Sequence, residues 1–419
     1  MKKFLIFIGV LLLFAIGFVC YDYFNNDNDE IEKLDIMDSV FTINKYYTYG
    51  TSLNIEGTID DKLNYSLVLY NGEFIRVPLI LKENTYVLSE YINDGLYLDD
   101  IPFGDYYLFV SSEYTLEDGS VGYKYYSINN ATTCDMTTYY SMSKYEKKVT
   151  IDFEDSYPTM MLHVEKNKDD SVYDIVIDPG HGGMDGGASA YGYSERDFTF
   201  QIAKKIQDRL ISEGYKVKLT REEDQLTKND LLDEYGIHGR AVISSEVKAK
   251  YLFSVHMNSN ANHNVNGLEV YTAKNINYDF AKKLVENINT YTGLNYSINK
   301  INKVFNSVYS RNFTDIDIQN SLKDYEKKGM NAYDISTNSN YYYMIRETGG
   351  IVTGAYVDDR NENIEGKYKK VGNPYWNSNT GVESYLLELG YITNKNDLDN
   401  MINNMDKYVD AIVDTIKDL

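Results

Sequence analysis

Cysteine, proline and histidine are scarce in this chain. Its 419 residues include two cysteines, five prolines and five histidines. Cys20 falls in an N-terminal apolar run, so the part of the chain after that run has one thiol, Cys134, and no internal disulfide. This scarcity argues against a disulfide-stapled secreted fold and leaves an extracellular location open. The length suits two or three domains with a sizeable core.

Basic residues are also in deficit. The chain has 41 Lys and Arg against 63 Asp and Glu, which gives a net charge of −22. Phosphate contacts need Lys and Arg, so the composition predicts no nucleic-acid partner. An anionic polymer substrate would have to be held by local groups rather than by the overall field. We interpret the 42 tyrosines as compositional bias and not as a binding code.

A long hydrophobic run is present only at the N-terminus. It covers residues 4–24 and follows Lys2 and Lys3. The run is long enough to span a bilayer, no A-x-A site follows it, and Val19 stands where a lipoprotein site needs a small residue. We interpret residues 1–24 as a membrane anchor in preference to a cleaved signal peptide. The rest of the chain is then expected to be extracytoplasmic.

Two regions of different pattern follow an acidic linker at residues 25–39. Between residues 40 and 165, short alternating apolar runs are separated by turn signals such as Asn71-Gly72. This spacing predicts a smaller antiparallel β-sandwich-like domain. The domain has no cluster of chemistry-bearing residues, and we interpret its single histidine, His163, as structural.

Residues 172–419 alternate strand-like and helix-like segments. Residues 251–256, YLFSVH, form the almost continuous apolar strand expected where both faces of a sheet are covered. The alternation predicts an α/β domain with a mostly parallel twisted sheet flanked by helices. Residues 294–379 are polar, irregular and too long for an ordinary connection, which makes them a candidate lid or substrate-site insertion.

Three chemistry-bearing residues lie at or just after the ends of strands in this predicted sheet. His181 follows YDIVID, His256 ends YLFSVH, and Glu388 lies near the end of YLLELG. Because the carboxyl ends of parallel strands meet at one crevice, we expect these side chains to converge. Glu195 begins the helix after a glycine-rich loop, which can return it to the same place. Burying a carboxylate is costly unless it is paired, so Glu388 is the most informative position.

Two histidines and a carboxylate form a ligand set for a catalytic zinc, with a fourth position open for water. A further carboxylate can take the proton of that water and return it. Asp178 is expected to accept the second N–H of His181 and so to fix its tautomer. His238 and His263 are weaker candidates. His238 sits beside Gly239 in a predicted helix and lacks a ligand-like partner, and His263 lies in a polar turn with Asn262 and Asn264.

Taken in order, these motifs resemble the zinc-dependent N-acetylmuramoyl-L-alanine amidases of the Amidase_3 type, which are bacterial cell-wall hydrolases. The matching residues, within about 172–419, are Asp178–Gly183, Glu195, Thr220-Arg221, Ser254–Asn258, Gly267–Tyr271 and Leu387–Asn394. The resemblance implies one Zn²⁺ per chain on His181, Glu195 and His256, with Glu388 as the catalytic carboxylate. The implied reaction cleaves the amide between N-acetylmuramic acid and L-alanine in peptidoglycan, outside the membrane.

The sequence departs from the family pattern in two places. Met257 stands where alanine is usual, and the stretch before Glu388 is longer than usual. Asn258 and Arg346 are candidate substrate-binding residues. Arg346 would clamp a substrate carboxylate, and a surface arginine is the alternative. The long stretch is interpreted either as part of the substrate site or as a segment that occludes it.

Two other functions stay open at this point. One is a non-catalytic wall-binding or scaffold protein on an amidase fold, which would be expected to lose a ligand or Glu388. The other is a zinc hydrolase that acts on another cell-wall bond. The β-rich domain could bind the wall, bind a protein partner such as an activator, or serve as a spacer.

Overall fold

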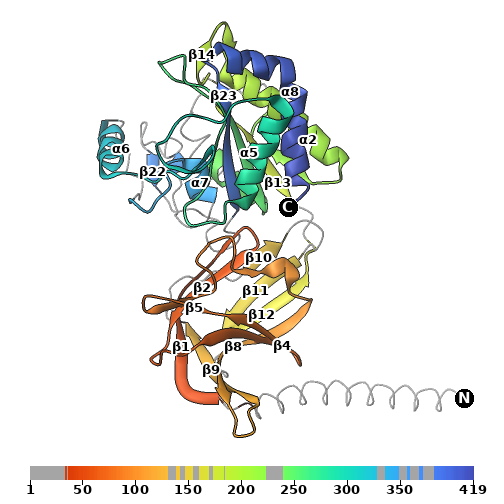
Figure 1. Cartoon of the computed structure of the whole chain (residues 1–419), viewed down its shortest axis with the longest axis vertical. Coiled ribbons are helices and arrows are strands. Elements are labelled where there is room, and N and C mark those ends of the chain that lie inside the picture. The colour runs from red at the N-terminus through yellow and green to blue at the C-terminus, as the bar shows by residue number, and fades with distance from the viewer. Residues whose placement is uncertain are drawn as a thin grey trace, which may run out of the picture.

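Two bodies are stacked along the long axis of the computed structural model (Figure 1). In its described residues the lower body contains strands and one short 3-10 helix, and the upper body combines a sheet with helices. The structure describes residues 34, 36–130, 138–141, 147–153, 160–168, 173–183, 185–222, 239–327, 336–348, 356–358, 368–370 and 382–419.

The strands of the lower body are joined into one twelve-stranded sheet. The main path runs β10-β11-β12-β8-β9-β1-β2-β6-β5, with β3 between β8 and β4, and β7 beside β2. The bounds are β1 Ile36–Tyr49, β2 Ser52–Thr58, β3 Tyr65–Tyr70, β4 Phe74–Pro78, β5 Ile80–Lys82, β6 Thr85–Val87, β7 Leu96–Tyr97, β8 Gly104–Thr115, β9 Val121–Asn130, β10 Thr138–Ser141, β11 Lys147–Phe153 and β12 Met160–Lys166. The short helix is Leu98–Asp100.

The prediction of an antiparallel sandwich is too simple for this body. The described strands form one hydrogen-bonded network, and β1 runs parallel to β9. The predicted end of the acidic linker at residue 39 was also wrong, because β1 already begins at Ile36. Alternate residues point to a shared apolar core, so that Leu67 and Leu69 of β3 and Leu108 and Val110 of β8 are fully buried.

The upper body is built on a seven-stranded sheet of order β16-β13-β17-β23-β18-β20-β19. The first four strands are parallel neighbours, whereas β18 is antiparallel to β23 and β19 to β20. The prediction of a mostly parallel sheet therefore holds for one half, and the whole sheet is mixed. The bounds are β13 Ile175–Pro179, β16 Val217–Leu219, β17 Tyr251–Asn258, β18 Glu269–Tyr271, β19 Lys303–Phe305, β20 Val308–Tyr309 and β23 Glu383–Tyr391.

Helices cover both faces of this sheet, as predicted. On one face, α2 buries Phe198, Ile202, Ile206 and Leu210, which recur at helical spacing, and α5 and α8 pack beside it. Each fully buried side chain of this size contributes about 1.5–3 kcal/mol. On the other face lie α4 and α7. The bounds are α2 Glu195–Ser212, α4 Arg240–Glu246, α5 Asp279–Thr292, α7 Tyr343–Thr348 and α8 Lys395–Ile416.

The segment 294–379 contains regular structure that the sequence did not predict. Besides β19, β20 and α7 it holds helix α6, Asp315–Lys327, and the strand pair β21, Tyr356–Asp358, with β22, Tyr368–Lys370. Whether this segment is a lid or occludes the site stays a prediction.

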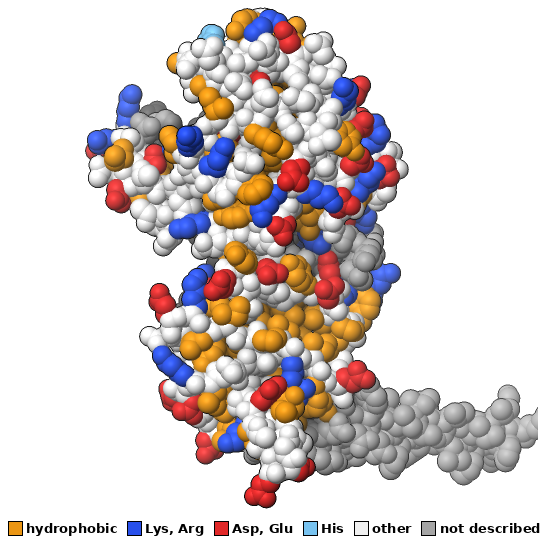
Figure 2. Space-filling view, viewed as in Figure 1, with side chains coloured by type: hydrophobic (Ala, Val, Ile, Leu, Met, Phe, Trp, Pro, Cys, Tyr) orange, Lys and Arg blue, Asp and Glu red, His pale blue; other side chains and the backbone are white. Residues whose placement is uncertain are grey.

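No helix in the described part of the chain has the length and apolar character needed to cross a membrane. The predicted anchor, residues 1–24, lies outside the described residues, so that interpretation stays a prediction. In the view of Figure 2, Lys and Arg are interspersed with Asp and Glu over the upper body. This face therefore carries no large field of one sign.

The lower body contacts the amino-terminal edge of the upper sheet. Lys250, just before β17, forms an ion pair of 2.8 Å with Asp99, and the Ser384 N–H at the start of β23 donates to the Tyr49 hydroxyl. The Asn93 side chain accepts from the Asn277 N–H at 2.7 Å and donates to its carbonyl at 3.2 Å. The carboxyl ends of β13 and β17 therefore face away from the lower body.

Replacing Asn93 with alanine is expected to lower the free energy of unfolding by about 1–3 kcal/mol, because the partly buried Asn277 N–H and C=O lose their partner. Urea denaturation followed by circular dichroism measures this change. Asn44→Ala is the matched control, since the exposed Asn44 side chain has one long hydrogen bond to Thr58, and a change within about 0.5 kcal/mol is expected. Equal effects of the two substitutions would contradict the role given to Asn93.

Candidate metal centre

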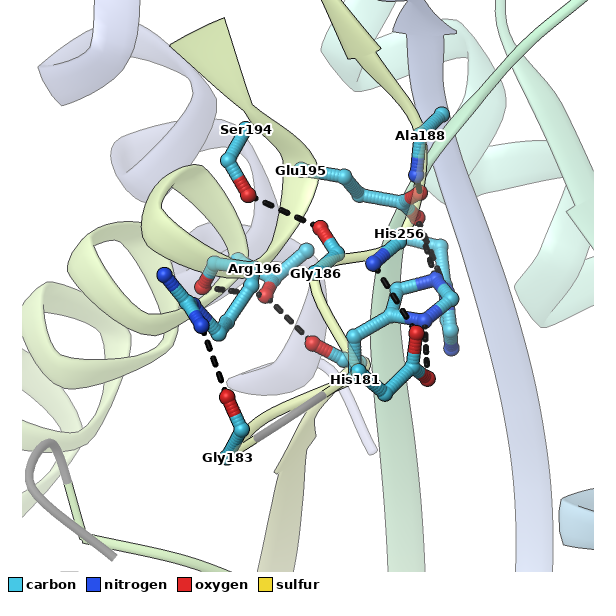
Figure 3. Close-up of polar contacts among 12 residues, drawn as sticks. His181, Gly183, Gly186, Ala188, Ser194, Glu195, Arg196 and His256 are labelled. Atoms are coloured by element: carbon cyan, nitrogen blue, oxygen red, sulfur yellow. Dashed lines mark hydrogen bonds and ion pairs between the residues drawn. The ribbon is translucent and has the colours of Figure 1, made fainter. Parts of the chain in front are cut away.

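The carboxyl-terminal edge of the sheet brings three predicted residues together. His181 follows the end of β13, His256 lies in β17, and Glu195 is the first residue of α2. Figure 3 shows the Glu195 carboxylate next to the two histidines. One Glu195 oxygen, Oε1, lies 3.1 Å from His181 Nε2 and 3.0 Å from His256 Nδ1. The three ligand atoms lie within 4.8 Å of one another.

Two imidazole nitrogens and a carboxylate oxygen, converging on one point, fit the donor set of a catalytic zinc site. The Glu195 carboxylate is held in place by backbone N–H groups: Ala188 donates to Oε2 at 2.9 Å and Met257 donates to Oε1 at 3.0 Å. The arrangement can therefore hold a metal ion with little rearrangement of the carboxylate.

The loop that carries His181 has an unusual backbone. His181 itself has φ of +62°, in the left-handed region, which is uncommon for a residue with a side chain. Backbone hydrogen bonds in both directions between Gly182 and Asp185 close the turn at 2.9 Å. A Cβ on Gly180 would lie 2.3 Å from the His256 ring. Only glycine at position 180 lets the two histidines face each other.

Gly180→Ala is expected to weaken zinc binding by on the order of 100-fold, because the new methyl group displaces the His256 ring. Competition with a chromophoric chelator measures the dissociation constant. Gly186→Ala in the same loop is the control, since its Cβ would meet only Ser194 Oγ, at 3.7 Å. Unchanged zinc binding in the Gly180 variant would show that the ring can move without cost.

Asp185, and not Asp178, contacts the second nitrogen of His181. Asp185 Oδ2 lies 2.7 Å from His181 Nδ1. Asp178 lies inside β13, where it is fully buried and accepts from Thr220 and Ser254 hydroxyls, both at 2.6 Å. The prediction for Asp178 was therefore wrong. Asp178 is close to His181 in the sequence, but its position in β13 directs its side chain into the interior of the protein.

The charges at the centre shift the pKa values of its groups. Burial alone lowers the pKa of His181, but the carboxylates of Glu195 and Asp185 raise it to about 9. Burial raises the pKa of Glu195, and the two histidines more than offset this, leaving it well below its usual value. The cluster therefore favours a cation at this point.

Glu388 lies beside the three ligand candidates. It is the direct parallel-strand neighbour of His256 and the antiparallel neighbour of Glu269. Its Oε2 is buried and has no hydrogen-bond partner among the described residues. Burial, followed by the charges of Glu195 and Glu269, raises the pKa of Glu388 well above its usual value. A carboxyl with a raised pKa is suited to hold and release a proton.

Sequence reasoning assigned no role to Glu269. This carboxylate is fully buried and accepts hydrogen bonds at 2.6–3.0 Å from Asn258, Tyr271, Ser297 and Tyr391. Its signal was an acidic residue within an apolar strand, the same signal that pointed to Glu388. The Asn258 amide is thus oriented by Glu269, and substrate binding by Asn258 stays a prediction.

Arg346 is buried and contacts backbone carbonyls. It lies in α7, is 5% exposed, and donates to the Asn340 and Tyr341 carbonyls at 2.8 and 3.1 Å. The alternative of a surface arginine was therefore wrong, and the substrate clamp stays a prediction. Of the two rival histidines, His263 lies in an exposed loop outside the His–Glu–His group, and His238 lies outside the described residues.

Comparison with known proteins supports the sequence resemblance. The family model described as "N-acetylmuramoyl-L-alanine amidase", Amidase_3, matches residues 175–418. The probable cell wall amidase LytH of Staphylococcus aureus is 35% identical over 100 residues, which are 23% of this chain and 30% of LytH. The aligned region thus spans less than a third of the length of the curated relatives it matches.

Solved structures are also similar to part of the chain. The catalytic domain of CwlV from Bacillus (Paenibacillus) polymyxa is 20% identical, with 59% of this chain and 97% of that chain covered and a TM-score of 0.37. AmiC2 of Nostoc punctiforme is 22% identical, with 59% and 96% covered and a TM-score of 0.35. Because the family model spans more than half of the sequence, this chain belongs to the Amidase_3 family of N-acetylmuramoyl-L-alanine amidases.

Proposed function

We propose that this protein hydrolyses the amide bond between N-acetylmuramic acid and L-alanine in peptidoglycan. The observation that carries the proposal is the Glu388 carboxyl beside the His181–Glu195–His256 group, whose buried Oε2 has no hydrogen-bond partner among the residues that the structure describes. Family membership supplies the substrate class. Since peptidoglycan lies outside the membrane, we also propose an extracytoplasmic location, with the N-terminal segment as anchor or signal.

The site would hold one Zn²⁺ through His181, Glu195 and His256. When bound, the ion supplies a Lewis acid for the lactyl carbonyl and lowers the pKa of a water. Asp185 accepts the Nδ1–H of His181, which leaves the Nε2 lone pair directed at the site. The Ala188 and Met257 N–H groups keep the Glu195 carboxylate from rotating.

Glu388 moves the proton in this reaction. As a carboxylate it accepts a proton from the attacking water, whose oxygen bonds to the lactyl carbonyl carbon. As an acid it then gives that proton to the alanine nitrogen while the carbon–nitrogen bond breaks. The products are a lactyl carboxylate and a stem peptide with a free amino terminus. A raised pKa suits a group that must act in both directions.

The two other functions receive less support. A scaffold protein would be expected to lose a ligand or Glu388, whereas this chain retains all four residues, which supports an enzyme. No feature of the described residues favours a zinc hydrolase acting on another wall bond. The role of the β-rich body in binding wall or a protein partner stays a prediction.

Digestion of purified peptidoglycan by the full chain tests the proposal. We expect one zinc per chain by atomic absorption and new amino termini that belong to alanine alone. New amino termini from other residues, or new reducing sugar ends, would assign a different bond. A protein that binds no zinc would remove the basis of the metal assignment.

A further inference from the structure

Two buried arginines that the proposed reaction does not use hold the loop of His181. Arg221 donates to the Pro179 carbonyl at 3.0 Å and to the Gly180 carbonyl at 3.3 Å. Arg240 donates to the His181 carbonyl at 2.7 Å. Guanidinium groups therefore bind three consecutive carbonyls of the loop. These contacts define the direction of its backbone directly before and at the first histidine.

Burying two charged guanidinium groups beside this loop carries a desolvation penalty. Burial and the nearby charge of Arg240 lower the pKa of Arg221 to about 10. Asp178 compensates in part, since its carboxylate lies 2.9 Å from Arg240 Nε. A left-handed residue such as His181 persists only where its surroundings fix it. The two arginines thus fix the backbone of the loop, and Arg240 binds the carbonyl of the strained residue, His181, itself.

Arg240 has a further partner outside the loop. Its Nη2 donates to the hydroxyl of Tyr343 at 3.1 Å. Tyr343 is the first residue of α7, the helix that packs on the sheet through Met344 and Ile345. One guanidinium group therefore joins the backbone of His181 to a helix of the long segment before β23. A shift of α7 would therefore displace the Arg240 guanidinium, which binds the His181 carbonyl.

We propose that Arg240 is a positioning residue through which helix α7 sets the metal affinity of the site at His181. The inference rests on the proposed metal site and adds a means by which contacts on α7 change that site. A substrate or protein that moves α7 would change how firmly the metal is held, without touching a ligand.

Zinc dissociation constants of the full chain test this coupling. Tyr343→Phe removes the hydroxyl contact and is expected to weaken zinc binding about tenfold. Arg240→Lys keeps the positive charge beside Asp178 but cannot donate to the His181 carbonyl and the Tyr343 hydroxyl at once. We expect it to weaken zinc binding by up to about 100-fold. Tyr341→Phe is the matched control, because it keeps the ring that stacks on Arg311 at 3.5 Å, and its affinity should equal the parent's.

A second readout separates positioning from general stability. The visible spectrum of bound Co²⁺ reports ligand geometry, and we expect it to change in the Tyr343 and Arg240 variants but not in Tyr341→Phe. Zinc affinities and Co²⁺ spectra equal to the parent's in both variants would overturn the positioning role while the proposed function stands. If Arg240→Lys does not fold, Tyr343→Phe alone decides. A parent chain that binds no zinc would overturn the proposed function and this inference with it.

Discussion

Replacing Glu388 with glutamine is expected to lower the rate of muramoyl–alanine cleavage by about 10²–10⁴-fold. The amide has nearly the same shape as the carboxyl but cannot take a proton from water. Because Glu388 is not one of the three converging ligand candidates, the variant is expected to keep one zinc per chain. Measuring kcat/KM for the release of alanine amino termini, together with zinc content, checks both expectations.

The matched control for this prediction lies on the same strand. Glu383 is also a buried carboxyl in β23, but it lies at the amino-terminal end, where its oxygen accepts from the Tyr385 hydroxyl. Glu383→Gln is expected to leave cleavage near the parent rate. If Glu388→Gln retained activity, another group would have to carry the proton. Equal losses in both variants would indicate damage to the strand instead of loss of a proton carrier.

The convergence of the site could be predicted because strand direction follows from pattern. The apolar runs that precede His181 and His256 in the sequence indicated parallel strands buried on both faces. The carboxyl ends of such strands meet at the same edge of a sheet. The glycine-rich loop explained how Glu195 could return to that edge. The antiparallel direction of β18 could not be predicted, because a strand of three residues carries too little pattern to indicate its partner or direction.

The supporting contacts of the site could not be predicted either. Asp178 and Asp185 both lie within four residues of His181, and only the strand geometry shows which one faces the ring. Arg240 precedes His256 by one helix and a strand, so its contact with the His181 carbonyl depends on the packing of the sheet. Arg346 lies in a segment with no clear periodicity, and its burial depends on α7.

Removal of the metal is expected to abolish cleavage and to destabilise the upper body. A ligand that binds only the folded state stabilises it by about 4.1 kcal/mol when its free concentration is 1,000 times Kd. Chelation should therefore lower the midpoint of thermal unfolding, and added zinc should restore both the midpoint and the activity. Calorimetry of the chelated and zinc-loaded full chain measures this difference.

Two histidine variants test whether the rise in the midpoint of thermal unfolding on adding zinc comes from the proposed centre. This rise is called the increment below. His256→Ala removes one of the three converging ligand atoms, so zinc should no longer raise the midpoint. His263→Ala removes a histidine from an exposed loop and should leave the increment intact. An increment lost in both variants would indicate zinc binding elsewhere on the surface. An increment kept in both would mean that the carboxylates, and not the histidine pair, dominate the site, and the role given to the carboxyl end of β17 would have to be withdrawn.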